Sequence, residues 1–428
     1  MAGLPGTVDG TVARMARIVY FSFPAYGHIY PTLPVMRELA GRGERIFYYG
    51  TERFKPLIRQ AGALFCPYTS RLSMPEHGPG PYAQVSTTIE TLIESSGAVL
   101  DSHLAEVRSL RPTHIMFDSF APWGRLVAQL LGLPAIASVP SILIDGEIAA
   151  RYGAGAERQP EDPRLTPQWY AAFRRRCHAR LLAYHLPRPL SPPELLQSYG
   201  DLNVVYTSRF FQPLAERFDD RRFRFVGPCC QFRPDAPPFP FERLDGRPLV
   251  LISLGTVYGD RPDFLRNCLE ELADAPWQVV LSTGRGFPAG DAPRNFIVRR
   301  FVPQVEILRR AAAFVTHGGM NSVQEALYHG VPLVMAPQAA DQFWISARAA
   351  ELGAAVVLDE PRRKAGAIRA SVAEVLSDAR YASAAARIAA SLRAAGGPAQ
   401  AADEIQAAPA NSAEVCAPAA ESLSGACH

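Results

Sequence analysis

The sequence predicts an α/β fold of two doubly wound parallel-sheet domains that face a cleft, and three observations support this prediction. Short apolar runs alternate with segments of helical spacing over most of the 428 residues, as in repeated β-α-β units. The first series of these units ends in a proline-rich stretch before residue 248, and a second series follows it. Glycines and polar residues directly follow several apolar runs, which is where parallel α/β sheets place their binding sites.

The first series of elements forms the predicted N-terminal domain, residues 15–230. Its expected strands are Arg17–Phe23, Arg45–Tyr49, Ala63–Tyr68, His114–Asp118, Pro134–Val139, Leu202–Thr207 and Phe223–Val226. Helical spacing covers Ile29–Ala40, Thr51–Gln60, Gln84–Leu110 and Ala121–Leu131. Residues 69–81 are rich in proline and glycine and are expected to form a loop. Residues 145–193 break the rhythm with a polar run and a basic helix near Phe173–Tyr184, which is typical of a loop over a pocket.

The second series forms the predicted C-terminal domain, residues 248–393, after a linker at residues 231–247. Its expected strands are Leu249–Leu254, Trp277–Leu281, Phe296–Phe301, Ala313–Thr316, Pro332–Met335 and Ala354–Leu358, with helices from there to about Arg393. The remaining segments, residues 1–14 and 394–428, are expected to be disordered tails, and the second is rich in alanine, glycine, serine and proline.

The composition argues against several classes of protein. The net charge of +3 gives no reason to expect nucleic acid as a partner. The seven cysteines show no metal-binding spacing, and residues 1–14 lack the apolar core of a secretory signal, so we predict reduced cysteines and a cytoplasmic protein. No run of eighteen apolar residues occurs, so stable membrane insertion is not expected.

The most informative stretch is Phe301–Gln342. Its strand Ala313–Thr316 leads into a turn and the start of a helix, where the glycine and polar residues are His317, Gly318, Gly319, Asn321 and Ser322. Glycines let the backbone approach a ligand closely, and the free N–H groups of a helix N-terminus favour a phosphate. The side chains of Ser322 and His317 add hydrogen-bond donors. The stretch therefore predicts a site for a phosphate or diphosphate.

Glu325 follows in the same predicted helix. It lies four residues after Asn321 and three after Ser322, so the three side chains can share one helix face. Its two carboxylate oxygens match the two vicinal hydroxyls of a ribose, which are both donors. The alternative interpretation is an exposed helix glutamate.

Two residues of the N-terminal domain are candidates for catalysis. His28 follows Gly27 where the first strand gives way to a helix, and a neutral imidazole there can accept a proton from a substrate hydroxyl. Asp118 ends the strand His114–Asp118, and if the two strands lie close together its carboxylate can orient His28 and stabilise the imidazolium. The alternatives are a capping or core histidine and a helix N-cap aspartate.

These motifs together resemble those of the family 1 glycosyltransferases of GT-B fold, and more narrowly the bacterial macrolide glycosyltransferase group. Gly27-His28 matches the catalytic-base motif of the family, and Phe301–Gln342 matches its donor-binding signature. The resemblance extends over residues 17–393 and is weakest at residues 145–240. It implies two Rossmann-like domains and an inverting, metal-independent transfer of a hexose, with UDP-glucose as the expected donor. The acceptor would be a hydroxyl of a lipophilic small molecule such as a macrolide or polyketide.

The resemblance also implies a role for each matched residue. Phe301 would stack on uracil, where many relatives have tryptophan, and Val302 and Gln304 would contact the base and ribose. Phosphate contacts would come from Thr256, His317, Asn321 and Ser322, next to Gly318 and Gly319, while Asp341 and Gln342 would hold the sugar hydroxyls. The acceptor would lie against apolar and aromatic segments that include Pro24, Tyr26, Ser119, Phe120 and Trp123. No cofactor and no metal are expected, since no two aspartates are separated by a single residue.

Three alternatives stay open at this point. The first is an antibiotic glycosyltransferase that uses a dTDP-deoxysugar as donor. The second is a sugar-nucleotide epimerase of the same fold, which needs no acceptor and leaves the large N-terminal pocket unexplained. The third is a catalytically silent helper or binding subunit, against which the presence of His28, Asp118, Glu325, Asp341 and Gln342 argues.

Overall fold

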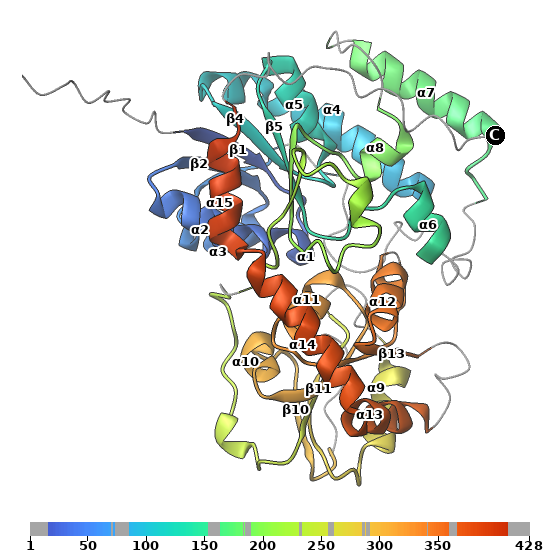
Figure 1. The fold of residues 1–428 in the computed structure, drawn as a ribbon. Coiled ribbons are helices and arrows are strands. Elements are labelled where there is room, and N and C mark those ends of the chain that lie inside the picture. The colour runs from blue at the N-terminus through green and yellow to red at the C-terminus, as the bar shows by residue number, and fades with distance from the viewer. Residues whose placement is uncertain are drawn as a thin grey trace, which may run out of the picture.

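The computed structural model of the chain describes residues 16–69, 72, 85–152, 163–182, 184, 190–230, 233–255, 261–284, 287, 292–339, 341–358 and 366–409. Two parallel sheets, each with helices on both faces, form two lobes, one above the other in Figure 1. The structure thus confirms the predicted α/β fold of two doubly wound domains.

The N-terminal sheet has the strand order β3-β2-β1-β4-β5-β6-β7 among the described residues, and all its pairs are parallel. Its strands are β1 Arg17–Phe21, β2 Arg45–Gly50, β3 Leu64–Pro67, β4 His114–Asp118, β5 Ala135–Val139, β6 Leu202–Val205 and β7 Phe223–Phe225. Along β1, Val19 and Phe21 belong to one buried cluster and Ile18 and Tyr20 to another, so both faces of the sheet are covered.

The helices of this domain are α1 Tyr26–Ile29, α2 Thr32–Gly41, α3 Lys55–Gln60, α4 Val85–Ser109, α5 Pro122–Leu131, α6 Gly146–Tyr152, α7 Pro167–Leu182 and α8 Pro192–Leu196. The helix expected at Ile29–Ala40 is in fact two helices, with Pro31 between them. Proline has no N–H to continue the helical hydrogen bonds, so His28 lies in a short turn of its own. The expected excursion contains α6, α7 and α8, and α7 begins earlier than the basic helix predicted near Phe173–Tyr184.

The C-terminal sheet has the order β10-β9-β8-β11-β12-β13 in the part of the chain that is described, again with parallel pairs. Its strands are β8 Leu249–Ser253, β9 Gln278–Ser282, β10 Phe296–Arg299, β11 Ala311–Thr316, β12 Leu333–Met335 and β13 Ala355–Val357. Its helices are α9 Pro262–Glu271, α10 Gln304–Leu308, α11 Met320–Tyr328, α12 Gln342–Glu351, α13 Ala367–Ser377 and α14 Ala379–Ala394.

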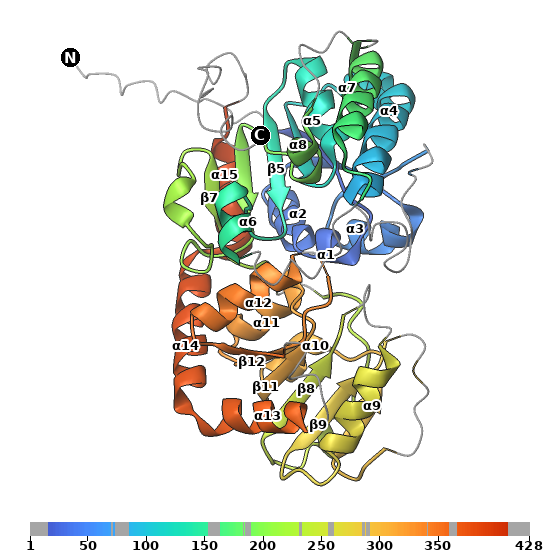
Figure 2. The ribbon, with the colours of Figure 1, turned by 90° about the vertical axis from the view of Figure 1, so that its right-hand side faces the viewer.

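The prediction of a disordered tail from residue 394 is wrong for its first part. After α14 the chain forms another helix, α15 Gly397–Ala407, which packs on α2 and β6 of the N-terminal domain (Figure 2). Ala401, Ala402 and Ile405 are buried there. The alanine-rich composition suggested low complexity, but alanine is the best helix former and lets a helix pack closely. Residues 1–14 and 410–428 lie outside the described part of the chain.

Candidate active site

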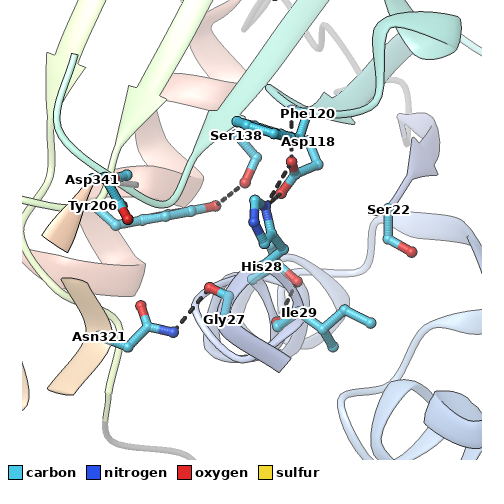
Figure 3. Close-up of polar contacts among 12 residues, drawn as sticks. Ser22, Gly27, His28, Ile29, Asp118, Phe120, Ser138, Tyr206, Asn321 and Asp341 are labelled. Carbon is cyan, nitrogen blue, oxygen red and sulfur yellow. Dashed lines mark hydrogen bonds and ion pairs between the residues drawn. The ribbon is translucent and has the colours of Figure 1, made fainter. Parts of the chain in front are cut away.

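His28 and Asp118 are brought together by the strand order. Because β1 and β4 are neighbours, the turn after β1 and the end of β4 meet at one edge of the sheet. The Nδ1 atom of His28 lies 2.9 Å from Oδ1 and 3.0 Å from Oδ2 of Asp118 (Figure 3). An ionised carboxylate only accepts hydrogen bonds, so Nδ1 donates and the lone pair of His28 is on Nε2.

The surroundings of this pair fix its geometry and charge. Asp118 has no exposed side-chain surface, and its Oδ1 also accepts a hydrogen bond of 2.8 Å from the backbone N–H of Phe120. Burial acts to lower the pKa of His28, but the charge and hydrogen bond of Asp118 outweigh it and the pKa is raised. The rings of Phe23 and Phe120 lie 4.7 and 5.5 Å from the imidazole, between ring centroids, so His28 has an apolar wall beside it.

Two hydrogen bonds join the domains at this point. Asn321 at the start of α11 donates from Nδ2 to the backbone oxygen of Gly27 over 2.9 Å. Ser141, in the segment after β5, donates from its Oγ to Oδ2 of Asp341 over 2.6 Å. Burial raises the pKa of Asp341, while Ser141 and the nearby His28 act against that rise. The contact between the domains therefore brings the carboxylate of Asp341 within electrostatic reach of the imidazole of His28 (Figure 3).

The turn His317-Gly318-Gly319 has the expected place between β11 and α11. Gly318 has a φ of 87°, and Gly319 is the N-cap of α11. A Cβ on Gly319 would lie 2.5 Å from Nε2 of His317, and a Cβ on Gly255 would lie 2.5 Å from its Cε1. The imidazole thus fits between two glycine backbones, and larger residues would displace it. Burial lowers the pKa of His317 to about 4, so the ring is neutral near pH 7 and has one N–H to donate.

Glu325 is buried, with only 2% of its side chain exposed, which excludes the alternative of an exposed helix glutamate. Gln304 donates from Nε2 to Oε2 of Glu325 over 2.7 Å and to Oγ of Ser322 over 3.2 Å. The other oxygen, Oε1, accepts from Nη2 of Arg233. Sequence reasoning missed Arg233, because a single arginine in a proline-rich linker carries no periodic or motif signal.

Three of the remaining predicted donor residues lie in the described part of the chain, and one does not. Phe301 is 42% exposed, with the guanidinium of Arg300 near its ring, and Val302 is partly buried beside it. Gln342 is 3% exposed, and its Oε1 accepts from the backbone N–H groups of Gln338 and Ala339. That oxygen therefore stabilises the preceding turn, and the contact of Gln342 with a sugar hydroxyl stays a prediction. Thr256 lies outside the described residues.

Of the five predicted acceptor residues, only three have side chains with exposed surface. Pro24, Tyr26 and Phe120 are partly exposed, but Ser119 and Trp123 are buried. The indole Nε1 of Trp123 donates to the hydroxyl of Tyr68 over 3.1 Å. The side chains of Ser119 and Trp123 thus pack inside the domain, and their contact with an acceptor stays a prediction. The predicted loop at residues 69–81 lies almost entirely outside the described residues.

Two features are absent from the described part of the chain. No group of three or more histidine, cysteine, aspartate or glutamate side chains is arranged to hold a metal ion. None of the described helices combines the length and the apolar character that a transmembrane span needs.

Comparison with known proteins identifies the family. A family model described as the C-terminal domain of erythromycin biosynthesis protein CIII-like proteins matches residues 266–408. The chain is 34% identical to the uncharacterized UDP-glucosyltransferase YojK of Bacillus subtilis, over 91% of this chain and 97% of that protein. It is also 34% identical to the demethyllactenocin mycarosyltransferase of Streptomyces fradiae, over 93% and 87% of the two chains.

The solved structures agree. The crystal structure of the glycosyltransferase of kitacinnamycin superposes with a TM-score of 0.79 at 32% identity, covering 92% of this chain and 99% of that one. Near-complete coverage in both directions means that the likeness includes both domains and the cleft between them. The chain therefore belongs to the family 1 glycosyltransferases of GT-B fold, in the bacterial macrolide glycosyltransferase group.

Proposed function

We propose that this glycosyltransferase transfers a hexose from a UDP-sugar, with UDP-glucose as the donor of choice, to a hydroxyl of a lipophilic small molecule, and inverts the anomeric centre. The observation that carries the proposal is the His28–Asp118 pair, which lies at the cleft edge opposite Asp341 of the other domain. An imidazole with its Nδ1 held by a buried carboxylate is arranged to work as a general base.

The reaction is a single displacement. Nε2 of His28 takes the proton of the acceptor hydroxyl as its oxygen forms a bond to the anomeric carbon. The bond from that carbon to the diphosphate oxygen breaks, and the electron pair leaves with UDP. Attack from the side opposite the leaving group inverts the configuration, and Asp118 stabilises the imidazolium that forms. Asp341 accepts hydrogen bonds from the sugar hydroxyls in this proposal.

The leaving diphosphate is stabilised by protein groups. Its charge would meet the N-terminus of α11, where the backbone approaches closely at Gly318 and Gly319. The neutral His317 adds one N–H, and Ser322 adds a hydroxyl. These donors act together on the charge that develops in the transition state.

We expect activity to survive an excess of chelator, since the residues above stabilise the diphosphate and no metal ligand set was found in the sequence. The measurement is UDP release with acceptor before and after EDTA treatment, with a metal-dependent glycosyltransferase treated in parallel as control. Loss of activity that Mg²⁺ or Mn²⁺ restores would contradict the proposed mechanism.

The donor nucleotide gives a second prediction. Glu325 has two buried oxygens for the two ribose hydroxyls, and 2′-deoxyribose leaves one of them short of a donor, at a cost of about 1–3 kcal/mol. UDP is therefore expected to bind about ten-fold more tightly than dTDP or 2′-deoxy-UDP. Calorimetric titration measures this, and in Glu325→Ala the preference should disappear. Equal affinities in the native enzyme would remove the ribose role from Glu325.

A second candidate keeps the chemistry and changes the donor to a dTDP-deoxysugar. The relative named for mycarosyl transfer favours it, since it is as similar to this chain as the relative named a UDP-glucosyltransferase. Incubation of the enzyme with UDP-glucose and a panel of macrolide and phenolic acceptors, read by mass spectrometry, tests the main proposal. Product with the UDP-sugar supports it, and product only with a dTDP-deoxysugar supports the second candidate. Epimer without acceptor, or no turnover at all, contradicts both.

A further inference from the structure

Arg233 lies in the segment that links the two domains and contacts both of them. Its Nη2 donates to Oε1 of Glu325 on α11, and its guanidinium carbon lies 3.9 Å from the ring centroid of Tyr30, just after α1. The hydroxyl of Tyr30 in turn donates to Oδ2 of Asp235, two residues further along the linker. The N-terminal domain, the linker and the C-terminal domain therefore meet at one guanidinium.

This contact meets an electrostatic need of the buried Glu325 carboxylate. The Glu325 side chain is 2% exposed, and a carboxylate so deeply buried is costly unless a cation or several donors satisfy it. Gln304 supplies one neutral donor, at 2.7 Å from Oε2. Arg233, itself only 19% exposed, supplies the positive charge.

The same carboxylate is where we place the ribose in the proposed function. Two ribose hydroxyls are donors that need Oε1 and Oε2 of Glu325, but both oxygens already have protein donors. A nucleotide and this guanidinium therefore compete for one acceptor.

We propose that Arg233 is a specificity-determining residue that acts as a latch, holding Glu325 in the empty enzyme and leaving it when a nucleoside diphosphate with a ribose diol binds. The proposal rests on the ribose role of Glu325 in the proposed function. Glu325 loses the hydrogen bond and the charge of Arg233 when the latch opens, and only a ligand that offers two donors replaces them. The latch therefore discriminates against deoxyribose and against free diphosphate. Binding also frees the linker from α11, which couples nucleotide recognition to the contact between the domains.

The latch predicts that removing a side chain near the site increases the affinity for UDP. A ligand that must displace an internal competitor binds with an affinity reduced by the fraction of enzyme in the unlatched form. Arg233→Ala removes the competitor, so UDP is expected to bind about ten-fold more tightly to the variant, within the usual range for such couplings. The variant without nucleotide should unfold at a lower temperature, because Glu325 is left buried without its cation.

The experiment compares two ligands on matched variants. UDP and 2′,3′-dideoxy-UDP are titrated by calorimetry into the native enzyme, Arg233→Ala and Arg310→Ala. Arg310 is a suitable control because its guanidinium also packs on an aromatic ring. That ring belongs to Phe241 of the linker, and its centroid lies 4.7 Å from the guanidinium carbon of Arg310. The hydrogen bond of Arg310 goes to the backbone of Glu306, which is not a site residue. Of the two ligands, only UDP is expected to bind more tightly. Of the two variants, only Arg233→Ala is expected to show this gain over the native enzyme. If Arg233→Ala does not fold, Tyr30→Leu, which removes the ring under the guanidinium, should shift UDP binding in the same direction.

The outcomes separate the latch from the function on which it rests. Weaker binding of UDP to Arg233→Ala would make Arg233 a ligand of the nucleotide and overturn the latch. An equal change for both ligands would overturn it too, because the competition is for the diol. If UDP and its dideoxy analogue bind the native enzyme equally and Glu325→Ala changes neither, the ribose role and the latch both fail. If the native preference for UDP holds and Arg233→Ala leaves it unchanged, only the latch fails.

Discussion

Replacing His28 by alanine is expected to lower the rate of glycosyl transfer by about 10²–10⁴-fold, the usual contribution of a positioned proton acceptor. The imidazole is fixed by its 2.9 Å hydrogen bond to Asp118, and the substitution removes this positioned proton acceptor. UDP affinity should stay the same, because the proposed donor site belongs to the other domain. The measurement is steady-state UDP release with an acceptor whose hydroxyl is not already ionised.

His329→Ala is the matched control for this substitution. His329 caps the far end of α11, away from the cleft edge, so its removal should leave the transfer rate close to that of the native enzyme. If His28→Ala retains near-native turnover, as His329→Ala is expected to do, then His28 is not the base.

Asp118→Asn is expected to have an effect of similar size, about 10²–10⁴-fold on kcat/KM, for a different reason. The asparagine oxygen can still accept from the backbone N–H of Phe120, which turns its amide N–H₂ toward Nδ1 of His28. An amide donor there requires Nδ1 to be the acceptor, so the proton moves to Nε2 and the base loses its lone pair. Circular dichroism and UDP affinity should remain native.

The pH profile distinguishes this explanation from a loss of fold. In the native enzyme Asp118 raises the pKa of His28, so activity should fall as the pH drops through that raised value and the imidazole takes up a proton. Without the carboxylate charge the pKa of His28 falls. The acid limb of Asp118→Asn should therefore lie at lower pH than the native limb, although the maximum rate is reduced. An unchanged acid limb would show that another group controls it.

Much of the fold was predictable because each strand of a parallel sheet is a short apolar run with its own local signal. The strand at His114–Asp118 was predicted to the residue, and the place of His28 after β1 followed from the glycine turn before it. Their meeting depended on sheet order, which a single sequence does not specify. The sequence left it as a condition, and the pairing of β1 with β4 fulfils that condition.

The failures share a physical cause, which is that they concern contacts between segments far apart in the chain. The contact of the Trp123 indole with Tyr68, 55 residues away, could not be predicted from the aromatic character of Trp123. Arg233 lies 92 residues from Glu325, and nothing in its neighbours along the sequence predicts the pair. Helix α15 was missed because its composition resembles that of a tail, while its partners lie in α2 and β6.

The return of α15 to the N-terminal domain has a consequence for how this protein can be divided. The chain passes between the domains twice, once through the linker and once between α14 and α15, where the backbone N–H of Gly397 donates to the oxygen of Val226. A protein cut at the linker would leave the α2 face that Ala401 and Ile405 cover exposed to water. The N-terminal domain is thus discontinuous in sequence, and exchanging N-terminal domains between relatives requires α15 to travel with residues 16–230.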